Sequence, residues 1–417
     1  MSLNDAPQGV RVHIALLGKR NAGKSSIINA ISGQETAIVS SIKGTTTDPV
    51  YKQMEILPIG PCVFIDTAGI DDTGDLGKLR MKKTLEVLNK TDIALFVVDA
   101  EILLTKEDYN VISDVKGKKI PLIVILNKID KIILPEETKT KIEILKEELQ
   151  CQVVMVSALK NIGIDKLKSE LIKLIPPDED KFKIVGDLIS AGDFVVLVTP
   201  IDKAAPKGRL ILPQQQTIRD ILESDAIAVV TKEYELKETL ENLKKKPKLV
   251  ITDSQVFLKV AADTPKDILM TSFSILFARF KGDLPELIKG ARAIKKLKNG
   301  DKVLIAEGCT HHKQSDDIAT VKIPRWVRQR TGKNIEFEYA SGVNFTDDVK
   351  KYALIIHCGG CMLNRAGMLS RIESAKQYNV PIVNYGILIA YVQGILERAL
   401  EPFPLAKLIW EEEEDFD

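Results

Sequence analysis

The sequence predicts an α/β protein with more than one domain. Two observations support this prediction: short apolar runs alternate with longer amphipathic segments, and the chain of 417 residues is too long for one ordinary core. The chain has 59 basic and 58 acidic residues, and 45% of its residues are hydrophobic, which is typical of a globular protein. This balance excludes a strong overall field for nucleic acid or an anionic membrane.

The first unit, residues 1–178, is expected to form a parallel sheet with helices between its strands. Buried strands are predicted at His13–Leu17, Cys62–Ile65, Ile93–Val98, Leu122–Leu126 and Gln152–Val156. A helix from Ile164 to Leu174 closes the unit. The pair Pro176-Pro177 and the charged stretch Asp178–Lys183 then indicate a linker.

A glycine-rich loop follows the first predicted strand. Its residues Gly18-Lys19-Arg20-Asn21-Ala22-Gly23-Lys24-Ser25 fit the P-loop pattern and precede the helical run Ser26–Ile31. In such a loop the backbone N–H groups and the helix N-terminus hold phosphates, Lys24 reaches the β and γ phosphates, and Ser25 binds Mg²⁺. The residues predicted to form the phosphate site are Gly18, Asn21, Ala22, Gly23, Lys24, Ser25 and Ser26.

Two further motifs are typical of a γ-phosphate sensor. Asp66-Thr67-Ala68-Gly69 follows a predicted strand, so that Asp66 can hold Mg²⁺ and the N–H of Gly69 can meet the γ-phosphate. Gly44-Thr45-Thr46-Thr47-Asp48 lies in a polar loop, and we expect Thr46 to close over Mg²⁺ when the γ-phosphate is present. The predicted magnesium ligands are therefore Ser25, Thr46 and Asp66.

The last two motifs of the first unit indicate guanine recognition. Asn127-Lys128-Ile129-Asp130 ends a strand, and Asp130 can accept hydrogen bonds from the guanine ring N–H and amino group, a donor pair that adenine lacks. Ser157-Ala158-Leu159 ends the next strand and can offer a backbone N–H to the guanine oxygen. The sequence therefore predicts a GTP-hydrolysing P-loop G domain.

The order and spelling of these motifs resemble the Era-like and tRNA-modification GTPases. That resemblance implies a K⁺ held beside the phosphates with the help of Asn21, and hydrolysis stimulated by potassium. Ile70 stands where Ras-like enzymes have a water-positioning glutamine, and an isoleucine cannot orient water, so slow intrinsic turnover is expected. The residues expected to act in catalysis are Lys24, Asn21, Thr46, Asp66 and Gly69.

A second, small α/β unit is predicted over residues 183–262. Its predicted strands are Asp193–Thr199, Ala226–Val230 and Leu249–Ile251, with helices at Gln214–Leu222 and Leu236–Leu243. The unit carries no paired catalytic carboxylates, histidine or cysteine. A structural or dimerisation role is therefore favoured over a catalytic one.

A third α/β unit is predicted over residues 263–417. Two helices are expected at its start, Asp267–Arg279 and Leu284–Lys296. The first contains the most apolar stretch of the chain, Ile268–Phe280, bracketed by charges that include Arg279 and Lys281, and we interpret it as a buried helix. Strands are predicted at Lys302–Ala306, Ile335–Tyr339, Ala353–Ile356 and Pro381–Asn384.

Three of the five cysteines cluster in this third unit, directly after two predicted strands. The motifs are Cys309-Thr310-His311-His312 and His357-Cys358-Gly359-Gly360-Cys361. Loops at the carboxyl ends of parallel strands can converge on a ligand. Three thiolates suit zinc or an iron-sulfur cluster, and the spacing alone leaves both open. Cys62 and Cys151 are interpreted as small core residues.

Over nearly its whole length the chain resembles the iron-iron hydrogenase maturation GTPases, the HydF family. The resemblance rests on a G domain, a small α/β domain containing Ala205–Gln214, and the C-terminal cysteine motifs. It implies a homodimer through the middle domain and a 4Fe-4S cluster on the third. The implied ligands are Cys309, Cys358 and Cys361, with His311 and His357 as a fourth ligand or as tuning residues.

The same resemblance implies partners. They are the immature iron-iron hydrogenase, which would receive a two-iron precursor, and two radical-SAM maturases upstream. A cytoplasmic location without membrane or nucleic-acid partners is expected, because neither a signal peptide nor an apolar run of spanning length is present. The alternative is an RNA-modification or ribosome-assembly GTPase with a structural zinc, which would be expected to carry a basic RNA-binding module.

Overall fold

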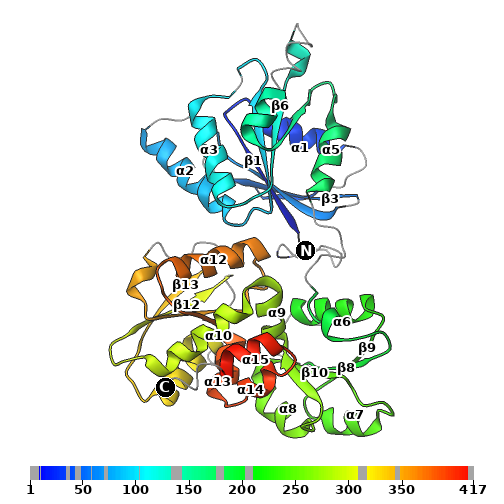
Figure 1. Ribbon diagram of the computed structural model, residues 1–417, viewed down its shortest axis with the longest axis vertical. Helices are drawn as coiled ribbons and strands as arrows, with labels where there is room; N and C mark the ends of the chain where they lie inside the picture. The colour runs from blue at the N-terminus through cyan, green and yellow to red at the C-terminus, as the bar shows by residue number, and fades with distance from the viewer. Residues whose placement is uncertain are drawn as a thin grey trace. The chain divides into compact units, whose positions relative to one another are not determined.

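A computed structural model describes most of the chain as two compact units, Met1–Lys181 and Phe182–Asp417 (Figure 1). The residues it describes are 9, 11–33, 38–42, 48–57, 59–69, 74–102, 104–132, 143–174, 183–201, 210–308, 317–342 and 348–411. Within these ranges, no helix combines the length and the apolar character needed to cross a membrane.

The first unit is built on a seven-stranded sheet with the order β2-β3-β4-β1-β5-β6-β7. The five strands predicted from sequence are present and parallel to one another. Strands β2 and β3 were not predicted, and β3 is antiparallel to both of its neighbours, β2 and β4. The strands are β1 Val12–Leu17, β2 Ile38–Ile42, β3 Val50–Ile56, β4 Gly60–Asp66, β5 Ile93–Asp99, β6 Leu122–Asn127 and β7 Gln152–Met155.

Helices cover both faces of this sheet. In Figure 1, α1 and α5 lie against one face and α2 and α3 against the other. Successive side chains of a strand point to opposite faces, so Leu16 packs with α1 and α5 whereas Leu17 packs with α3. These helices are α1 Lys24–Ser32, α2 Gly74–Leu88, α3 Lys106–Gly117 and α5 Ile164–Lys173, the last as predicted, and residues 143–149 are helical as well.

The order of the strands determines where a ligand can bind. Strand β1 lies between β4 and β5, so the connections that leave β1 and β4 run to opposite sides of the sheet. Such a switch point leaves a crevice at the carboxyl ends of the strands. The loop after β1 begins at Gly18, which places the predicted phosphate loop in that crevice.

The second unit contains two parallel four-stranded sheets. Their orders are β11-β10-β8-β9 and β13-β12-β14-β15. The strands are β8 Phe194–Val198, β9 Ile227–Thr231, β10 Leu249–Thr252, β11 Leu269–Ser272, β12 Lys302–Glu307, β13 Glu336–Ser341, β14 Leu354–His357 and β15 Ile382–Asn384. Every predicted strand of this part is present, and β11 is additional.

Strand β11 corrects the predicted helix at Asp267–Arg279. Residues Leu269–Ser272 pair with β10, and the helix α9 begins only at Phe273 and ends at Lys281. The side chain of Ser272 caps α9 by accepting a hydrogen bond from the N–H of Ile275. A continuous apolar run cannot distinguish one buried helix from a buried strand followed by a helix.

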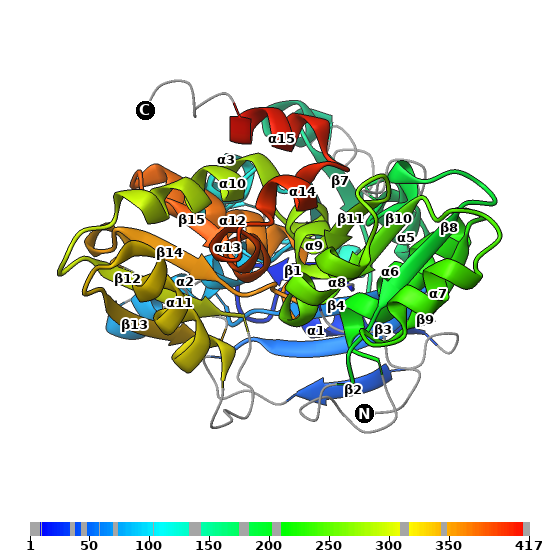
Figure 2. The same ribbon diagram turned by 90° about the horizontal axis from the view of Figure 1, so that it is seen from below.

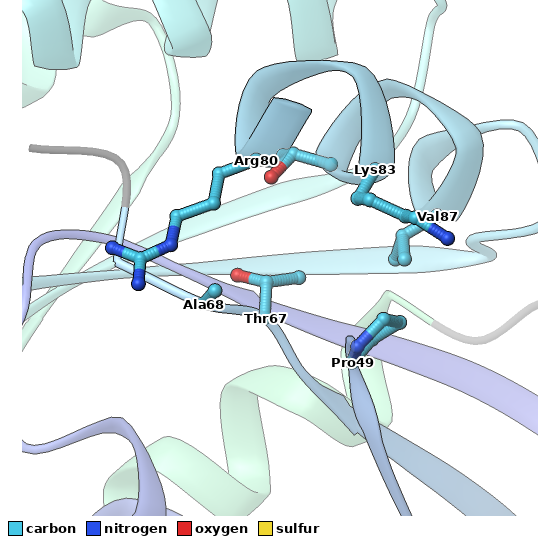
Figure 3. Close-up of a pocket in the computed structure, with 7 residues that line it drawn as sticks. Pro49, Thr67, Ala68, Arg80, Lys83 and Val87 are labelled. Atoms are coloured by element: carbon cyan, nitrogen blue, oxygen red, sulfur yellow. The ribbon is translucent and has the colours of Figure 1, made fainter. Parts of the chain in front are cut away.

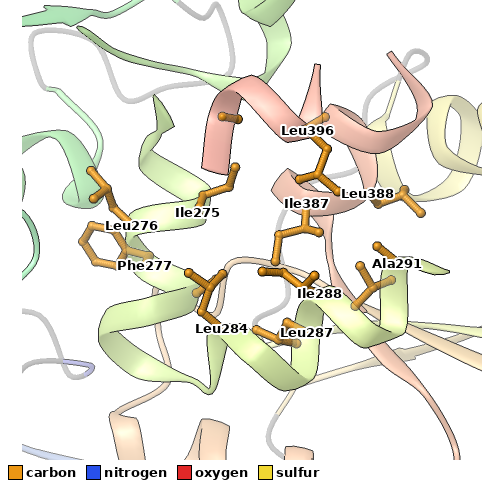
Figure 4. Packing of buried hydrophobic residues seen from close by; sticks show 14 of the residues in the cluster. Ile275, Leu276, Phe277, Leu284, Leu287, Ile288, Ala291, Ile387, Leu388 and Leu396 are labelled. Carbon is orange, nitrogen blue, oxygen red and sulfur yellow. The ribbon is translucent and has the colours of Figure 1, made fainter. Parts of the chain in front are cut away.

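One continuous apolar core extends through the second unit. Helices α9, α10, α13 and α14 pack together in it, as Figure 4 shows, and Figure 2 shows these helices beside the two sheets. Gly290 allows α10 to approach β15 closely, because a Cβ there would lie 1.9 Å from the Ile382 carbonyl oxygen. The other helices are α6 Leu212–Glu223, α7 Leu236–Asn242, α8 Phe257–Asp263, α10 Leu284–Ala293, α11 Ile323–Thr331, α12 Arg365–Gln377, α13 Tyr385–Val392, α14 Leu396–Leu400 and α15 Pro404–Glu411.

Candidate nucleotide and metal sites

The phosphate loop has the backbone that the motif requires. Gly18 and Gly23 have φ values of 133° and 97°, and Asn21 also has a positive φ of 60°. A side chain at Gly23 would place its Cβ 2.2 Å from the Asn127 Nδ2 atom, and one at Gly18 would meet the Val97 carbonyl at the same distance. Glycine is therefore required at both positions.

Lys24 and Ser25 are placed at the mouth of this loop. The Nζ atom of Lys24 donates to the carbonyl oxygens of Gly18 (2.8 Å) and Lys19 (2.9 Å), so it lies across the turn that would surround a phosphate. The Oγ atom of Ser25 donates to Oδ2 of Asp66 at 2.6 Å. A hydroxyl and a carboxylate are hard oxygen ligands, so this pair fits Mg²⁺.

The turn after β4 is tied to the phosphate loop strand. Thr67 uses both its N–H (3.3 Å) and its hydroxyl (2.6 Å) to donate to the carbonyl of Leu16, which anchors Asp66 beside β1. Gly69 is buried at the end of the turn. Thr46 lies outside the described residues, whereas Asp48 forms an ion pair with Lys83 of α2 at 3.3 Å.

A small hollow opens beside this turn. Figure 3 shows Arg80, Lys83 and Val87 of α2 on one side of the hollow, with Thr67, Ala68 and Pro49 on the other. Its lining residues are Pro49, Thr67, Ala68, Arg80, Lys83, Thr84 and Val87. The hollow therefore lies between α2, Pro49 just before β3, and the turn after β4, which is expected to respond to the γ-phosphate.

Asn127 connects the phosphate loop to the guanine-binding loops. Its side chain is 2% exposed. Its Nδ2 donates to the carbonyl of Ala22 (2.9 Å), and its Oδ1 accepts from the N–H of Ala158 (3.1 Å). One amide thus spans two loops, which explains why the motif needs an asparagine with one donor and one acceptor end.

Asp130 is held for recognition of the base. The hydroxyl of Ser157 donates to its Oδ1 at 2.6 Å, and this hydrogen bond lowers the pKa of Asp130. The carboxylate is therefore ionised at neutral pH, as an acceptor for guanine must be. Leu159 extends outward from the same loop and is 86% exposed.

Two features of this site were missed from sequence. Lys128, at a positive φ of 67°, forms an ion pair with Asp99 at the end of β5 (2.7 Å). Lys19 of the phosphate loop donates to the hydroxyl of Thr105 (2.8 Å), the N-cap residue of α3. Neither Asp99 nor Thr105 belongs to a recognisable motif. The one sequence signal for Asp99 was its position at the end of a predicted parallel strand, where binding residues are common, and Thr105 had no such signal.

The second candidate site lies at the carboxyl ends of β12 and β14. These neighbouring strands form the switch point of their sheet, since β13 lies beyond β12 and β15 lies beyond β14. The sulfur of Cys358 accepts hydrogen bonds from the N–H groups of Gly308 (3.1 Å) and Gly360 (3.4 Å). Cys309, His311 and His312 lie outside the described residues, but Gly308 directly precedes Cys309.

His357 has both ring nitrogens engaged. Nδ1 lies 2.7 Å from the carbonyl of Cys358, which can only accept, so Nδ1 carries the proton. Nε2 then accepts from the guanidinium of Arg371 at 2.7 Å. Burial, followed by the charge of Arg371, lowers the pKa of His357 to about 3. The imidazole is therefore neutral and holds the backbone of the cysteine motif.

Lys281 is the second buried cation near the cysteines. It is 2% exposed, and its Nζ donates to the carbonyls of Gly360, Cys361 and Leu363. Burial lowers the pKa of Lys281 to about 8, which keeps most of the ammonium protonated at neutral pH. From the sequence, Lys281 was only one of the charges that bracket an apolar run.

Burial also affects the thiols. It raises the pKa of Cys358, and it raises the pKa of Cys62, which is buried in the first unit, to about 12. The thiol of Cys62 therefore stays protonated, in agreement with a core role. Among the described residues, no group of three or more His, Cys, Asp or Glu side chains has the arrangement of a metal site, which leaves Cys309 and His311 untested.

The first unit is similar to tRNA modification GTPases. The protein of Thermoanaerobacter sp. (strain X514) is 40% identical over 162 residues, which are 39% of this chain and 34% of that protein. The protein of Aquifex aeolicus (strain VF5) is 36% identical over 165 residues, with the same coverage of 39% and 34%. The chain thus spans about a third of the length of these relatives. The solved structure of Aquifex aeolicus Era is 22% identical, covers 53% of this chain and 94% of its own, and has a TM-score of 0.35.

Family models match all three parts of the chain. The family described as 50S ribosome-binding GTPase matches residues 13–128. The hydrogen maturase F dimerization domain matches residues 184–282, and the hydrogen maturase F tetramerization domain matches residues 285–402. The latter two together cover just over half of the chain. With its GTPase domain preceding both, the chain therefore belongs to the hydrogen maturase F family.

Proposed function

We propose that this GTPase of hydrogenase maturation is an iron carrier. It binds a 4Fe-4S cluster through Cys309, Cys358 and Cys361, receives a two-iron precursor, and hands it to the immature iron-iron hydrogenase. Two radical-SAM maturases supply the precursor. The observation that carries the proposal is the 3.1 Å hydrogen bond from the Gly308 N–H to the Cys358 sulfur, because it brings the chain next to Cys309 within reach of the Cys-x-x-Cys turn.

The described donors suit an anionic iron-sulfur group. Thiolates are soft ligands for iron-sulfur clusters, and N–H donors to sulfur stabilise their negative charge. The Cys358 sulfur has two such donors, and the buried cations Lys281 and Arg371 contact the same motif directly or through His357. When bound, the cluster supplies an iron with an exchangeable ligand position. The residues present therefore fit the group.

The two histidines take different roles in this proposal. His357 has no ring nitrogen left for a metal, since one donates to the Cys358 carbonyl and the other accepts from Arg371. It positions the cysteine backbone while the imidazole itself stays uncharged. His311 follows Cys309 by two residues and supplies the weak, exchangeable fourth bond.

The G domain provides the timing of this transfer. Lys24 leaves the carbonyls of Gly18 and Lys19 to contact the β and γ phosphates, and the Ser25 hydroxyl and Asp66 carboxylate, already 2.6 Å apart, hold Mg²⁺. Thr46 and the N–H of Gly69 close over the γ-phosphate. Asn21 helps to hold K⁺ beside the phosphates, where its positive charge stabilises the negative charge of the transition state. Ile70 stands where other GTPases have a water-positioning glutamine, so intrinsic turnover is slow.

The matches to dimerization and tetramerization domains support an oligomer. We infer a homodimer that forms through the sheet β11-β10-β8-β9. Strand β9 is an edge of that sheet, and its Ile227 and Val230 are 41% and 45% exposed. An exposed edge strand offers unpaired backbone groups to a second copy. The proposed domain limits are 1–178, 183–262 and 263–417.

A role in RNA modification has less support. The tRNA modification GTPases match this chain only over its first unit, whereas the hydrogen maturase F models match the rest. Nothing outside the G domain therefore favours an RNA substrate.

The cluster is tested on protein purified without oxygen and reconstituted with iron and sulfide. We expect brown protein with thiolate-to-iron absorption and about four irons per chain, the number in one 4Fe-4S cluster. Cys358→Ser should lose both the absorption and the iron. Cys151→Ser, which alters a thiol in the other unit, serves as the matched control and should keep the cluster. A colourless protein that retains one zinc would replace the proposal with a structural zinc site.

Delivery is tested separately by mixing loaded protein with immature hydrogenase and measuring hydrogen production. Activation should need the loaded protein and should fail with Cys361→Ser. Hydrolysis of GTP should be faster in potassium than in sodium, and Asn21→Ala should remove that difference. Equal rates in both salts for the unaltered protein would contradict the cation role of Asn21.

A further inference from the structure

A lysine ammonium lies inside the second unit at the end of α9. Burying a charged group is costly unless its hydrogen-bonding capacity is used. Lys281 has three protons and meets three acceptors: the carbonyls of Gly360 (3.3 Å), Cys361 (3.1 Å) and Leu363 (2.8 Å). All three carbonyls belong to one turn, so the hydrogen bonds of the ammonium group all stabilise that turn.

That turn carries the Cys-x-x-Cys motif. Residues 360–363 close on themselves through a hydrogen bond from the Leu363 N–H to the Gly360 carbonyl (3.0 Å), and Gly360 has a φ of 61°. The turn is about eighty residues from Lys281 in the chain, and α9 packs against α12, the helix that follows the turn. The lysine therefore joins the motif to a rigid helix across the core.

The backbone carbonyls of Cys358 and Cys361 each accept a hydrogen bond, one from a buried cation and the other from a histidine that is itself bound to a cation. Lys281 binds the Cys361 carbonyl, and His357, fixed by Arg371, binds the Cys358 carbonyl at 2.7 Å. Arg371 also donates to the Gly342 carbonyl at 2.7 Å. The two arrangements are independent, because Lys281 is on α9 and Arg371 is on α12.

We propose that Lys281 is a positioning residue for the metal-binding turn: its three hydrogen bonds hold the thiols in ligand geometry, and its buried charge favours the more reduced state of a thiolate-bound metal group. This inference rests on the proposed cluster site, but its first half concerns the metal-free chain alone. A positive charge near a redox group stabilises added electrons, so its removal makes reduction harder.

Two variants and one control test the proposal. Lys281→Met keeps the length but removes both donors and charge, whereas Lys281→Gln keeps two donors without charge. Lys289→Met, at a half-exposed lysine of α10, is the control. Hydrogen exchange of the amides at 361–364 in metal-free protein should be at least about tenfold faster in Lys281→Met, because the turn loses the three hydrogen bonds that Lys281 donates.

The second measurement is a redox titration of the reconstituted cluster. Both Lys281 variants should have a more negative midpoint potential than the unaltered protein, and Lys289→Met should match it. Wild-type protein without a cluster would defeat the proposed function but not the exchange result. Unchanged exchange and potential in both variants would overturn the inference. Failure of both variants to fold, by circular dichroism, would assign Lys281 to the core alone and would also overturn it.

Discussion

Replacing Asn127 by alanine is expected to loosen the phosphate loop and the guanine loop together. The side chain is buried, donates to the Ala22 carbonyl, and accepts from the Ala158 N–H. Each hydrogen bond contributes about 1 kcal/mol net, and a partner left unsatisfied in a buried place costs about 1–2 kcal/mol more. The expected loss of local stability is therefore about 3–4 kcal/mol, or roughly 150- to 1,000-fold in the opening equilibrium of the two loops.

Hydrogen exchange followed by mass spectrometry of nucleotide-free protein measures this opening directly. Peptides that cover residues 18–24 and 157–160 should exchange faster in Asn127→Ala, and binding of a fluorescent GDP analogue should weaken. Asn110→Ala, on the exposed side of α3, is the control and should change neither. If Asn127→Ala left the exchange of both loops within twofold of the unaltered protein, the bridging role would be refuted, whatever happened to nucleotide affinity.

Three further predictions concern the first unit. Asp130→Asn should shift preference from GTP towards xanthosine triphosphate, because the carboxylate that accepts from the guanine N–H and amino groups is lost, and unchanged competition between the nucleotides would contradict this. Ser25→Ala should weaken the Mg²⁺ dependence of nucleotide binding, since the 2.6 Å partner of Asp66 is removed, as a magnesium titration would measure. Burial lowers the pKa of His13 from 6.5 to about 4, so the imidazole takes up a proton more readily in the unfolded state than in the folded state. The free energy of unfolding of this unit should therefore decrease as the pH falls from about 6.5 towards 4. Urea unfolding measured across this pH range should show that decrease, and His13→Gln should abolish it.

The arrangement of the first unit was largely predictable. Its five parallel strands and their motifs were located because a buried parallel strand is a short apolar run and each functional residue follows the end of such a run. Strands β2 and β3 were missed, since antiparallel strands at the edge of a sheet mix polar and apolar residues. The partner of Lys128 was missed as well, because Asp99 is far from it in the chain.

The second unit exposes the limit of periodicity. Residues 268–280 were expected to form one helix, yet four of them form β11 before α9 begins. An apolar run that is buried both as a strand and as a helix contains no pattern that marks where the strand ends and the helix begins. The pairing of Leu269 with Leu249 across the sheet makes this segment a strand. Propensity is a weak prior where tertiary contacts compete with it.

The sequence alone was enough to predict the chemistry of the candidate sites: phosphate binding by eight consecutive residues, guanine selection by Asp130, and soft-metal ligands in a short cysteine motif. These properties are local, because the atoms that act belong to neighbouring residues. The tertiary structure decided which distant charges surround them. Lys281 reaches the cysteine turn, and Arg371 reaches His357 beside it, only because α9 and α12 pack against each other, a consequence of a shared core that no stretch of sequence encodes alone.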